Sequence, residues 1–179
     1  MKGRCLNVLA VIIAICILLI SDNASAENEW KAYETNCCTI HYSDDDHLRT
    51  FTLRIGGFKF TSEGLDQRLS LVKPRMDEIM EKVQAALDMH PPEIHIKIFL
   101  YPDFGSLDKE FRKFTLTRKT PLAFYAHKTR SIYVDVSSIT DGVLAHEMAH
   151  GVINFYFKTP PPAKMQEILA QYVDLHLWD

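Results

Sequence analysis

Apolar residues in the middle of the chain recur at two spacings, one typical of helices and one typical of strands. The helical spacing begins near Pro74, which suits a first helical turn, and stops before His90-Pro91-Pro92. Its apolar face consists of Met76, Ile79, Met80, Val83 and Leu87. A shorter helical pattern precedes it, at Leu65, Leu69 and Val72. A strict alternation follows it and predicts a strand with one buried face, at Ile94, Ile96, Ile98 and Leu100.

The segment before the long helix gives weaker patterns. Residues 39–42 predict a strand, and residues 43–46 form an acidic turn. Residues 50–55 alternate in the manner of a second strand, so we expect a hairpin across this turn. A helix is the alternative, because one helical face would carry Leu48, Phe51 and Ile55.

The segment after the alternating strand predicts a short helix and a hairpin. The helix is expected around residues 106–114. Residues 122–127 and 131–136 then predict two strands separated by a short basic turn, most simply an antiparallel hairpin. Together with the long helix, these elements predict an α+β fold in which a small mixed sheet packs on that helix.

Two further helices are predicted near the C-terminus. Ser138 and Asp141 have the spacing of a capping box, so a helix is expected from there to about Phe157. The prolines at 160–162 force a break. A final helix is then predicted by Met165, Ile168, Leu169, Tyr172 and Val173.

The N-terminus has the pattern of a secretory signal peptide over residues 1–26. Lys2 and Arg4 precede an apolar run, and Ala24-Ser25-Ala26 is a small-residue cleavage pattern. The alternative is an uncleaved membrane anchor, although the apolar run is shorter than the ~20 residues that span a bilayer. We therefore expect an exported protein, periplasmic or extracellular, whose mature chain is a single domain over residues 27–179.

Charge and cysteine content narrow the function classes. The formal net charge of −3 becomes −4 when residues 1–26, which carry +1, are removed. This balance does not favour nucleic-acid binding. Only the adjacent Cys37 and Cys38 remain in the mature chain, and neighbouring cysteines bridge each other only in a strained geometry. We interpret them as packing or surface thiols rather than as a disulfide framework or metal ligands.

The chemistry is concentrated in His146-Glu147-Met148-Ala149-His150, on the first of the two C-terminal helices. Residues four apart lie on the same helical face, so both imidazoles can ligate one metal ion. The carboxylate of Glu147 projects beside them, where it can accept a proton from a water molecule that the ion activates. The pentapeptide therefore predicts a catalytic zinc site that still needs a third ligand.

Glu167, on the final helix, is the candidate for this third ligand. The stretch Met165-Gln166-Glu167-Ile168-Leu169-Ala170-Gln171-Tyr172 resembles the glutamate helix of the gluzincin metallopeptidases, with Ile168 where glycine is common. The preceding proline run and the order of strands and helices upstream are also similar to the family. The chain thus resembles the peptidase MA-like domains of exported bacterial proteins.

This resemblance implies a zincin-like fold with an HExxH active-site helix and a C-terminal glutamate helix. It implies a zinc metallopeptidase that holds one zinc ion per chain through His146, His150 and Glu167, with Glu147 as general base. It also implies that the strand Ala123-Phe124-Tyr125-Ala126 forms the sheet edge above the cleft and pairs with an extended peptide or protein substrate.

Other family features have weaker counterparts in this sequence. Tyr125 and His127 are candidates for the donor that stabilises the oxyanion, with ordinary packing as the alternative. Gln171 stands where some gluzincins have an aspartate that orients a ligand; Asp174, on the same helical face as Glu167, is the weaker candidate for that role. Tyr172 is expected in the core.

A non-catalytic function is the alternative to the peptidase. A zinc-binding module without an oxyanion donor would bind extended peptide or an envelope protein while cleaving little or nothing. Glu147 favours the enzyme, because a purely structural zinc site needs no base. A membrane partner is expected only if the N-terminal segment is not cleaved.

Overall fold

A mixed five-stranded sheet forms the centre of the computed structural model, which describes residues 30–56, 70–117 and 119–179. The strands lie in the order β1-β2-β3-β5-β4. The three central strands are parallel, and each outer strand is antiparallel to its neighbour. Their bounds are Lys31–Glu34 (β1), Cys38–Tyr42 (β2), Ile96–Tyr101 (β3), Ala123–Ala126 (β4) and Ser131–Asp135 (β5). The predicted α+β class is confirmed, whereas the expected signal peptide lies outside the described residues.

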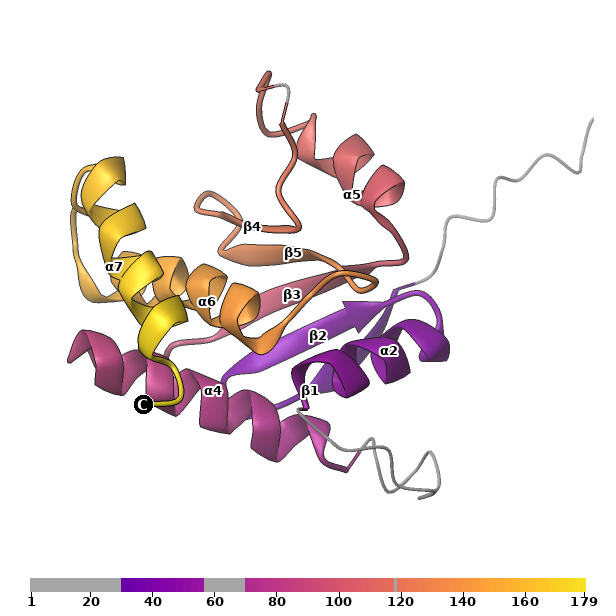
Figure 1. Ribbon diagram of the computed structural model, residues 1–179, viewed down its shortest axis with the longest axis horizontal. Coiled ribbons are helices and arrows are strands. Elements are labelled where there is room, and N and C mark those ends of the chain that lie inside the picture. The colour runs from indigo at the N-terminus through magenta and orange to yellow at the C-terminus, as the bar shows by residue number, and fades with distance from the viewer. Residues whose placement is uncertain (1–29, 57–69, 118) are drawn as a thin grey trace, which may run out of the picture.

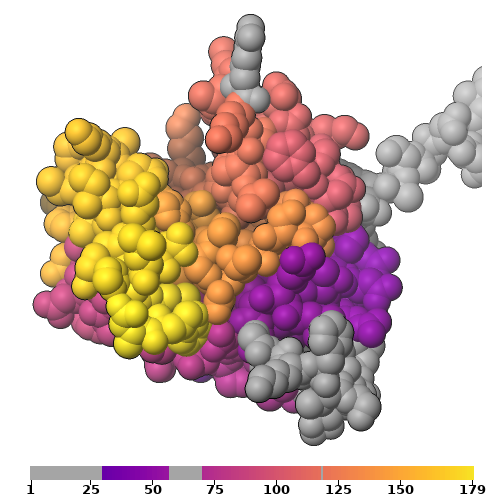
Figure 2. All heavy atoms as spheres, in the orientation of Figure 1, coloured from indigo at the N-terminus to yellow at the C-terminus, as the bar shows by residue number. Residues whose placement is uncertain are grey.

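Five helices surround the described part of the sheet. They are α2 (Asp45–Ile55), α4 (Val72–Leu87), α5 (Phe104–Phe111), α6 (Asp141–Tyr156) and α7 (Ala163–His176). The main core joins α2, α4 and α6 to one sheet face, while α5 packs on the other face (Figure 1). Figure 2 shows that α7 stands beside a hollow whose other side is the segment around β4 and α5. No helix in the described residues is long and apolar enough to cross a bilayer.

The two strongest periodic patterns are confirmed. The apolar face predicted for α4 is buried along its whole length, and the helix ends at Leu87 where Asp88 adopts a left-handed φ of 50°. In β3, Ile96, Ile98 and Leu100 are fully buried against the helices. The expected helical positions Leu65 and Leu69 lie outside the described residues.

The hairpin expected across residues 39–55 is wrong, because residues 45–55 form the helix α2. The side chain of Asp44 caps this helix by accepting the N–H of Asp46 at 2.8 Å. Burial then selects the helical face, since Leu48, Phe51 and Ile55 are at most 2% exposed. The acidic turn is thus the beginning of a helix, and β2 pairs with β1 and β3 instead.

The hairpin expected between residues 122 and 136 is confirmed as β4 and β5. Phe124 lies opposite Tyr133, and β4 is the last strand of the sheet. The carbonyl of Leu122 accepts the N–H of Asp135, which continues the same register. In an antiparallel pair, bonded residues alternate with outward-facing ones. The N–H and C=O groups of Ala123 and Tyr125 therefore face away from β5, toward the open edge.

The helix that carries the HExxH sequence begins two residues later than the expected capping box. Thr140, rather than Ser138, is the N-cap residue, and its hydroxyl accepts the N–H of Val143 at 3.2 Å. Asp141 does not reach back to the cap. Its carboxylate instead accepts hydrogen bonds from Arg75 and Trp178, which tie the start of α6 to α4 and to the C-terminal segment.

Candidate metal centre

Helix α6 places the two histidines side by side at the edge of the core. Leu144, Ala145 and Met148 are fully buried, so they fix which face of the helix meets the sheet and α4. His146 and His150 lie on a different face, with ring centroids 5.1 Å apart and side chains 20% and 13% exposed. The i, i+4 spacing thus brings both imidazoles to one partly open side, as the sequence predicts.

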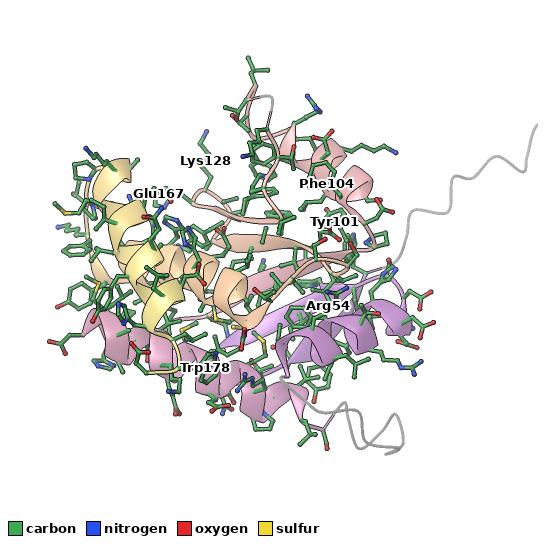
Figure 3. All side chains as sticks on the ribbon, viewed as in Figure 1. Arg54, Tyr101, Phe104, Lys128, Glu167 and Trp178 are labelled. Atoms are coloured by element: carbon green, nitrogen blue, oxygen red, sulfur yellow. The ribbon has the colours of Figure 1, made fainter. Side chains whose placement is uncertain are left out.

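Glu167 reaches the same point from α7. Its Oε2 lies 3.5 Å from His146 Nε2, and its Oε1 lies 3.4 Å from His150 Nε2. One ligand atom from each of the three residues falls within 4.8 Å of the other two. Figure 3 shows Glu167 projecting from α7 on the side that faces the sheet. Two imidazole nitrogens and one carboxylate oxygen form a donor set that fits a zinc ion with one open position.

Glu147, which follows His146 on α6, is hydrogen-bonded to the edge strand β4. Its side chain is buried, and its Oε2 accepts the backbone N–H of Tyr125 at 2.7 Å. Burial raises the pKa of Glu147 to about 8; the N–H of Tyr125 opposes this rise and the charge of Glu167 adds to it. The hydrogen bond holds Oε2 against β4, so the other carboxylate oxygen, Oε1, is available to a second partner.

A cavity of about 530 Å³ joins these groups. Its walls include the three candidate ligands, Glu147, and residues of β4 on the opposite side. Ala123, Phe124 and Tyr125 all line it. The hollow beside α7 in Figure 2 therefore contains the predicted metal ligands, the predicted base and the sheet edge.

The two candidate oxyanion donors differ in their surroundings. The ring of Tyr125 packs against the main core beside Gly151, and its hydroxyl is buried without a hydrogen-bond partner in the described residues. Burial raises the pKa of Tyr125 to about 12, although the charge of Arg130 opposes the rise. His127 is exposed and lines the cavity. Of the two side chains, His127 is therefore the one that is free to turn toward a substrate.

Two expectations on α7 are wrong. Tyr172 is 50% exposed and lies against His176, with ring centroids 4.5 Å apart, so it is not a core residue. Asp174 does not line the cavity. Its carboxylate lies beside Gly142, in the first turn of α6 and one turn before His146. In the described residues the carboxylate that faces both imidazoles is that of Glu167, and no hydrogen bond joins Asp174 to either of them.

Two amides that the sequence reading missed support His150. The Asn154 side chain donates to the carbonyl of His150 at 2.7 Å and approaches Gln166 Oε1 at 3.4 Å. Gln166 in turn donates to the carbonyl of Pro161 at 2.7 Å. Burial lowers the pKa of His150, while the charge of Glu167 and a hydrogen bond to Gln166 oppose that change. The only hint in the sequence is position: Asn154 follows His150 by one turn, and Gln166 precedes Glu167.

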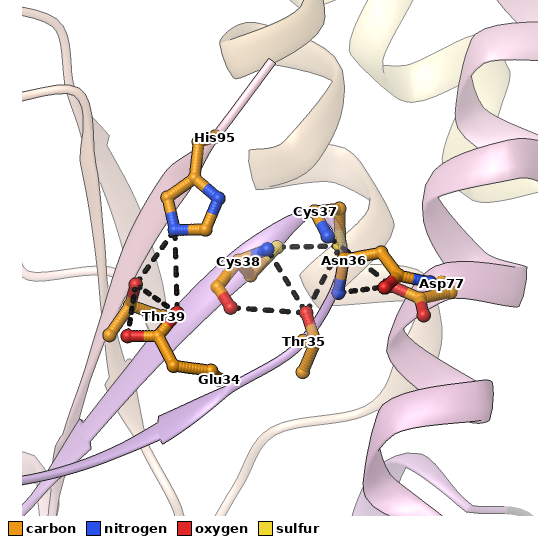
Figure 4. Close-up of polar contacts among 8 residues, drawn as sticks. All are labelled: Glu34, Thr35, Asn36, Cys37, Cys38, Thr39, Asp77 and His95. Carbon is orange, nitrogen blue, oxygen red and sulfur yellow. Dashed lines mark hydrogen bonds and ion pairs between the residues drawn. The ribbon is translucent and has the colours of Figure 1, made fainter. Parts of the chain in front are cut away.

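The adjacent cysteines are a packing feature away from this centre. Cys37 and Cys38 are buried free thiols whose sulfur atoms lie 2.8 Å apart within hydrogen-bonding distance. Burial raises the pKa of Cys38 well above its usual range. Asp77 of α4 accepts the N–H groups of Asn36 and Cys37, which fixes this turn on the helix (Figure 4). The interpretation as packing thiols agrees with this burial, and neither sulfur belongs to the histidine and glutamate group.

Comparisons of the chain with protein-family models, with curated proteins and with solved structures found no match.

Gly151 sets the distance between α6 and the sheet. A β-carbon at this position would overlap Ile96 Cδ1 and would lie 3.5 Å from the ring of Tyr125. Because Ile96 is fully buried, Gly151→Ala is expected to lower the free energy of unfolding by about 1–2 kcal/mol in denaturant titrations, despite the better helix propensity of alanine. Adding Ile96→Val, which removes Cδ1, should recover at least half of that loss. Additive effects of the two substitutions would contradict this account.

Proposed function

We propose that this protein is a zinc-dependent peptidase of the gluzincin type, with a zincin-like, peptidase MA-like domain. The observation that carries the proposal is the position of Glu167, whose two oxygens face the Nε2 atoms of His146 and His150 from a second helix. Two neighbouring imidazoles on one helix and a carboxylate from a second helix form the two-histidine, one-glutamate donor set of catalytic zinc sites. Because residues 1–26 have the pattern of a signal peptide, we also propose that the protein is exported.

His146, His150 and Glu167 would hold the zinc ion. Bound there, zinc polarises a carbonyl group and makes a water molecule acidic enough to serve as a nucleophile at neutral pH. Glu147 supplies the proton transfers. Because Tyr125 N–H holds Oε2, Oε1 is the atom that accepts the proton of the attacking water and later delivers it to the leaving nitrogen.

The edge of β4 would hold the substrate. Ala123 offers an outward N–H and C=O, and Tyr125 offers an outward C=O, all beside the cavity that contains Glu147. An extended peptide can pair with these groups and so lay its main chain along the cavity. His127, at the end of β4, is the residue that we assign to the oxyanion.

One observation favours the alternative of a peptide-binding zinc module with little catalysis. The hydroxyl of Tyr125, one of the two candidate donors, belongs to a ring that packs in the core. If His127 does not serve as the donor, the described residues of the cavity offer few polar groups to stabilise the transition state. The module would then bind peptide along β4 without cleaving it.

Metal analysis and peptide cleavage test the proposal together. The purified mature chain should contain about one zinc ion per molecule, and it should cleave peptides in a proteome-derived library read by mass spectrometry. A chelator should abolish cleavage, and zinc, but not magnesium, should restore it. Absence of stoichiometric zinc would remove both the peptidase and the zinc module; zinc without cleavage would leave only the module.

A further inference from the structure

The cavity at the candidate metal centre continues into a second hollow of about 520 Å³. His127, Asn154 and Pro160 line both, so the two form one continuous surface. The second hollow lies where the β4–β5 turn meets the last turn of α6 and the loop that follows it. Its other walls include Arg130, Phe155 and Lys158.

This second hollow carries unpaired positive charge. Arg130 has a left-handed φ of 51°, and its guanidinium carbon lies 4.7 Å from the ring centroid of Phe155. Within the described residues, neither Arg130 nor Lys158 forms an ion pair, and Glu93 is the one carboxylate in the lining. Figure 3 shows Lys128 projecting from the same turn. A chain with a net charge of −3 thus presents a locally basic end to its cavity.

The spacing to the metal centre suits a peptide that already lies on β4. Asn154 follows His150 by four residues, which is about 6 Å along the helix axis. An extended peptide advances about 3.3 Å per residue, so this offset corresponds to about two residues from the bond at the metal. Phe157, which also lines the second hollow, follows His150 by seven residues, or about 10 Å along the axis, which corresponds to three residues of the peptide. A side chain at that point of the peptide would meet Arg130 and Lys158.

We propose that this hollow is a subsite that selects an acidic side chain, Asp or Glu, two or three residues before the scissile bond. The proposal rests on the proposed function, since it places the peptide along β4. We place the peptide antiparallel to β4, and this arrangement gives its direction. The β4 strand runs toward His127, beside the carboxyl-terminal end of α6, so a peptide antiparallel to β4 has its earlier residues at Arg130. Arg130 would bind the carboxylate in a forked geometry, with Lys158 adding a second charge.

The test measures binding separately from cleavage. The probes are fluorescein-labelled, end-blocked peptides of eight residues in which a single Asp moves through an otherwise uncharged sequence, each with a matched Asn peptide. Fluorescence anisotropy with the zinc-loaded Glu147→Gln chain should show an Asp preference of roughly three- to tenfold at the best position. The Arg130→Gln, Lys158→Gln double variant should lose this preference while binding the Asn peptide as before.

The matched control removes two positive charges at positions outside the second hollow. Arg54 and Lys73 are exposed on α2 and α4 and line neither hollow, so their double replacement by glutamine should leave the Asp preference intact. Cleavage by the wild-type chain should then occur two or three residues after the favoured Asp. Equal binding of Asp and Asn peptides, no binding of either, or loss of the preference in the control would overturn the subsite. An intact preference without any cleavage would support the subsite and refute the peptidase.

Discussion

Glu147→Gln is expected to reduce peptide cleavage by roughly 10²–10⁴-fold while zinc remains bound. Glutamine has nearly the same shape, and its amide oxygen can still accept the N–H of Tyr125 that Glu147 accepts at 2.7 Å. The substitution therefore removes the proton acceptor at Oε1 without removing the contact between α6 and β4. The measurement is kcat/KM on a peptide identified in the library, compared with the zinc content of the same preparation.

The matched control for this substitution is Glu81→Gln, a change of the same kind on the exposed side of α4. It should leave both kcat/KM and zinc content within the error of the wild type. Identical cleavage profiles for wild type and Glu147→Gln, with zinc retained in both, would remove the peptidase. The zinc-binding module would then be the remaining function for this centre.

His150→Ala is expected to weaken zinc binding by more than about 100-fold, since even outer partners of a metal ligand are worth up to that factor. The imidazole is 13% exposed and lies 3.4 Å from Glu167 Oε1, so its loss leaves two ligands on separate helices. Competition with a chromogenic chelator measures the affinity. The rise in melting temperature that zinc gives the wild-type chain should also disappear, because the ion no longer favours the folded state.

The exposed His90, in the loop after α4, provides the control. His90→Ala should keep the zinc affinity and the thermal shift of the wild type. Full retention of zinc by His150→Ala, at the wild-type affinity, would show that the assignment of the ligands is wrong, whatever the chain does to peptides.

The sequence predicted the features that depend on strong local periodicity. Helix α4 and strand β3 have unbroken apolar patterns, and burial follows these patterns residue by residue. The histidine pair needed only the i, i+4 geometry of a helix. Glu167 required one long-range assumption, that α7 folds back on α6, and the proline run between the two helices made that turn possible.

Features for which two local patterns compete were harder to predict from the sequence. In residues 45–55 the alternation of a strand and the face of a helix coexist, and a cap at Asp44 together with burial of Phe51 decides for the helix. The start of α6 is a similar case, because Ser138 and Thr140 are both good caps. Only the path of the chain into the helix selects Thr140.

Apart from the approach of Glu167 to the histidines, contacts between distant side chains could not be predicted. The hydrogen bond from Tyr125 to Glu147 and the contact of Asn154 with Gln166 join residues from different elements. Their existence depends on distances set by packing, for example at Gly151, where α6 lies against β3. The exposure of Tyr172 has the same origin, since α7 packs mainly on α6 and leaves that ring in solvent.

If β4 binds a peptide as proposed, the hydrogen bond between Tyr125 and Glu147 also limits how that peptide is recognised. On an open strand edge each outward residue normally offers a donor and an acceptor, and such pairing does not depend on the sequence of the guest. Here the donor of Tyr125 is already engaged, so the guest strand gains one main-chain bond fewer next to the base. A larger part of the binding energy must then come from guest side chains, which makes this edge more discriminating than its length alone would suggest.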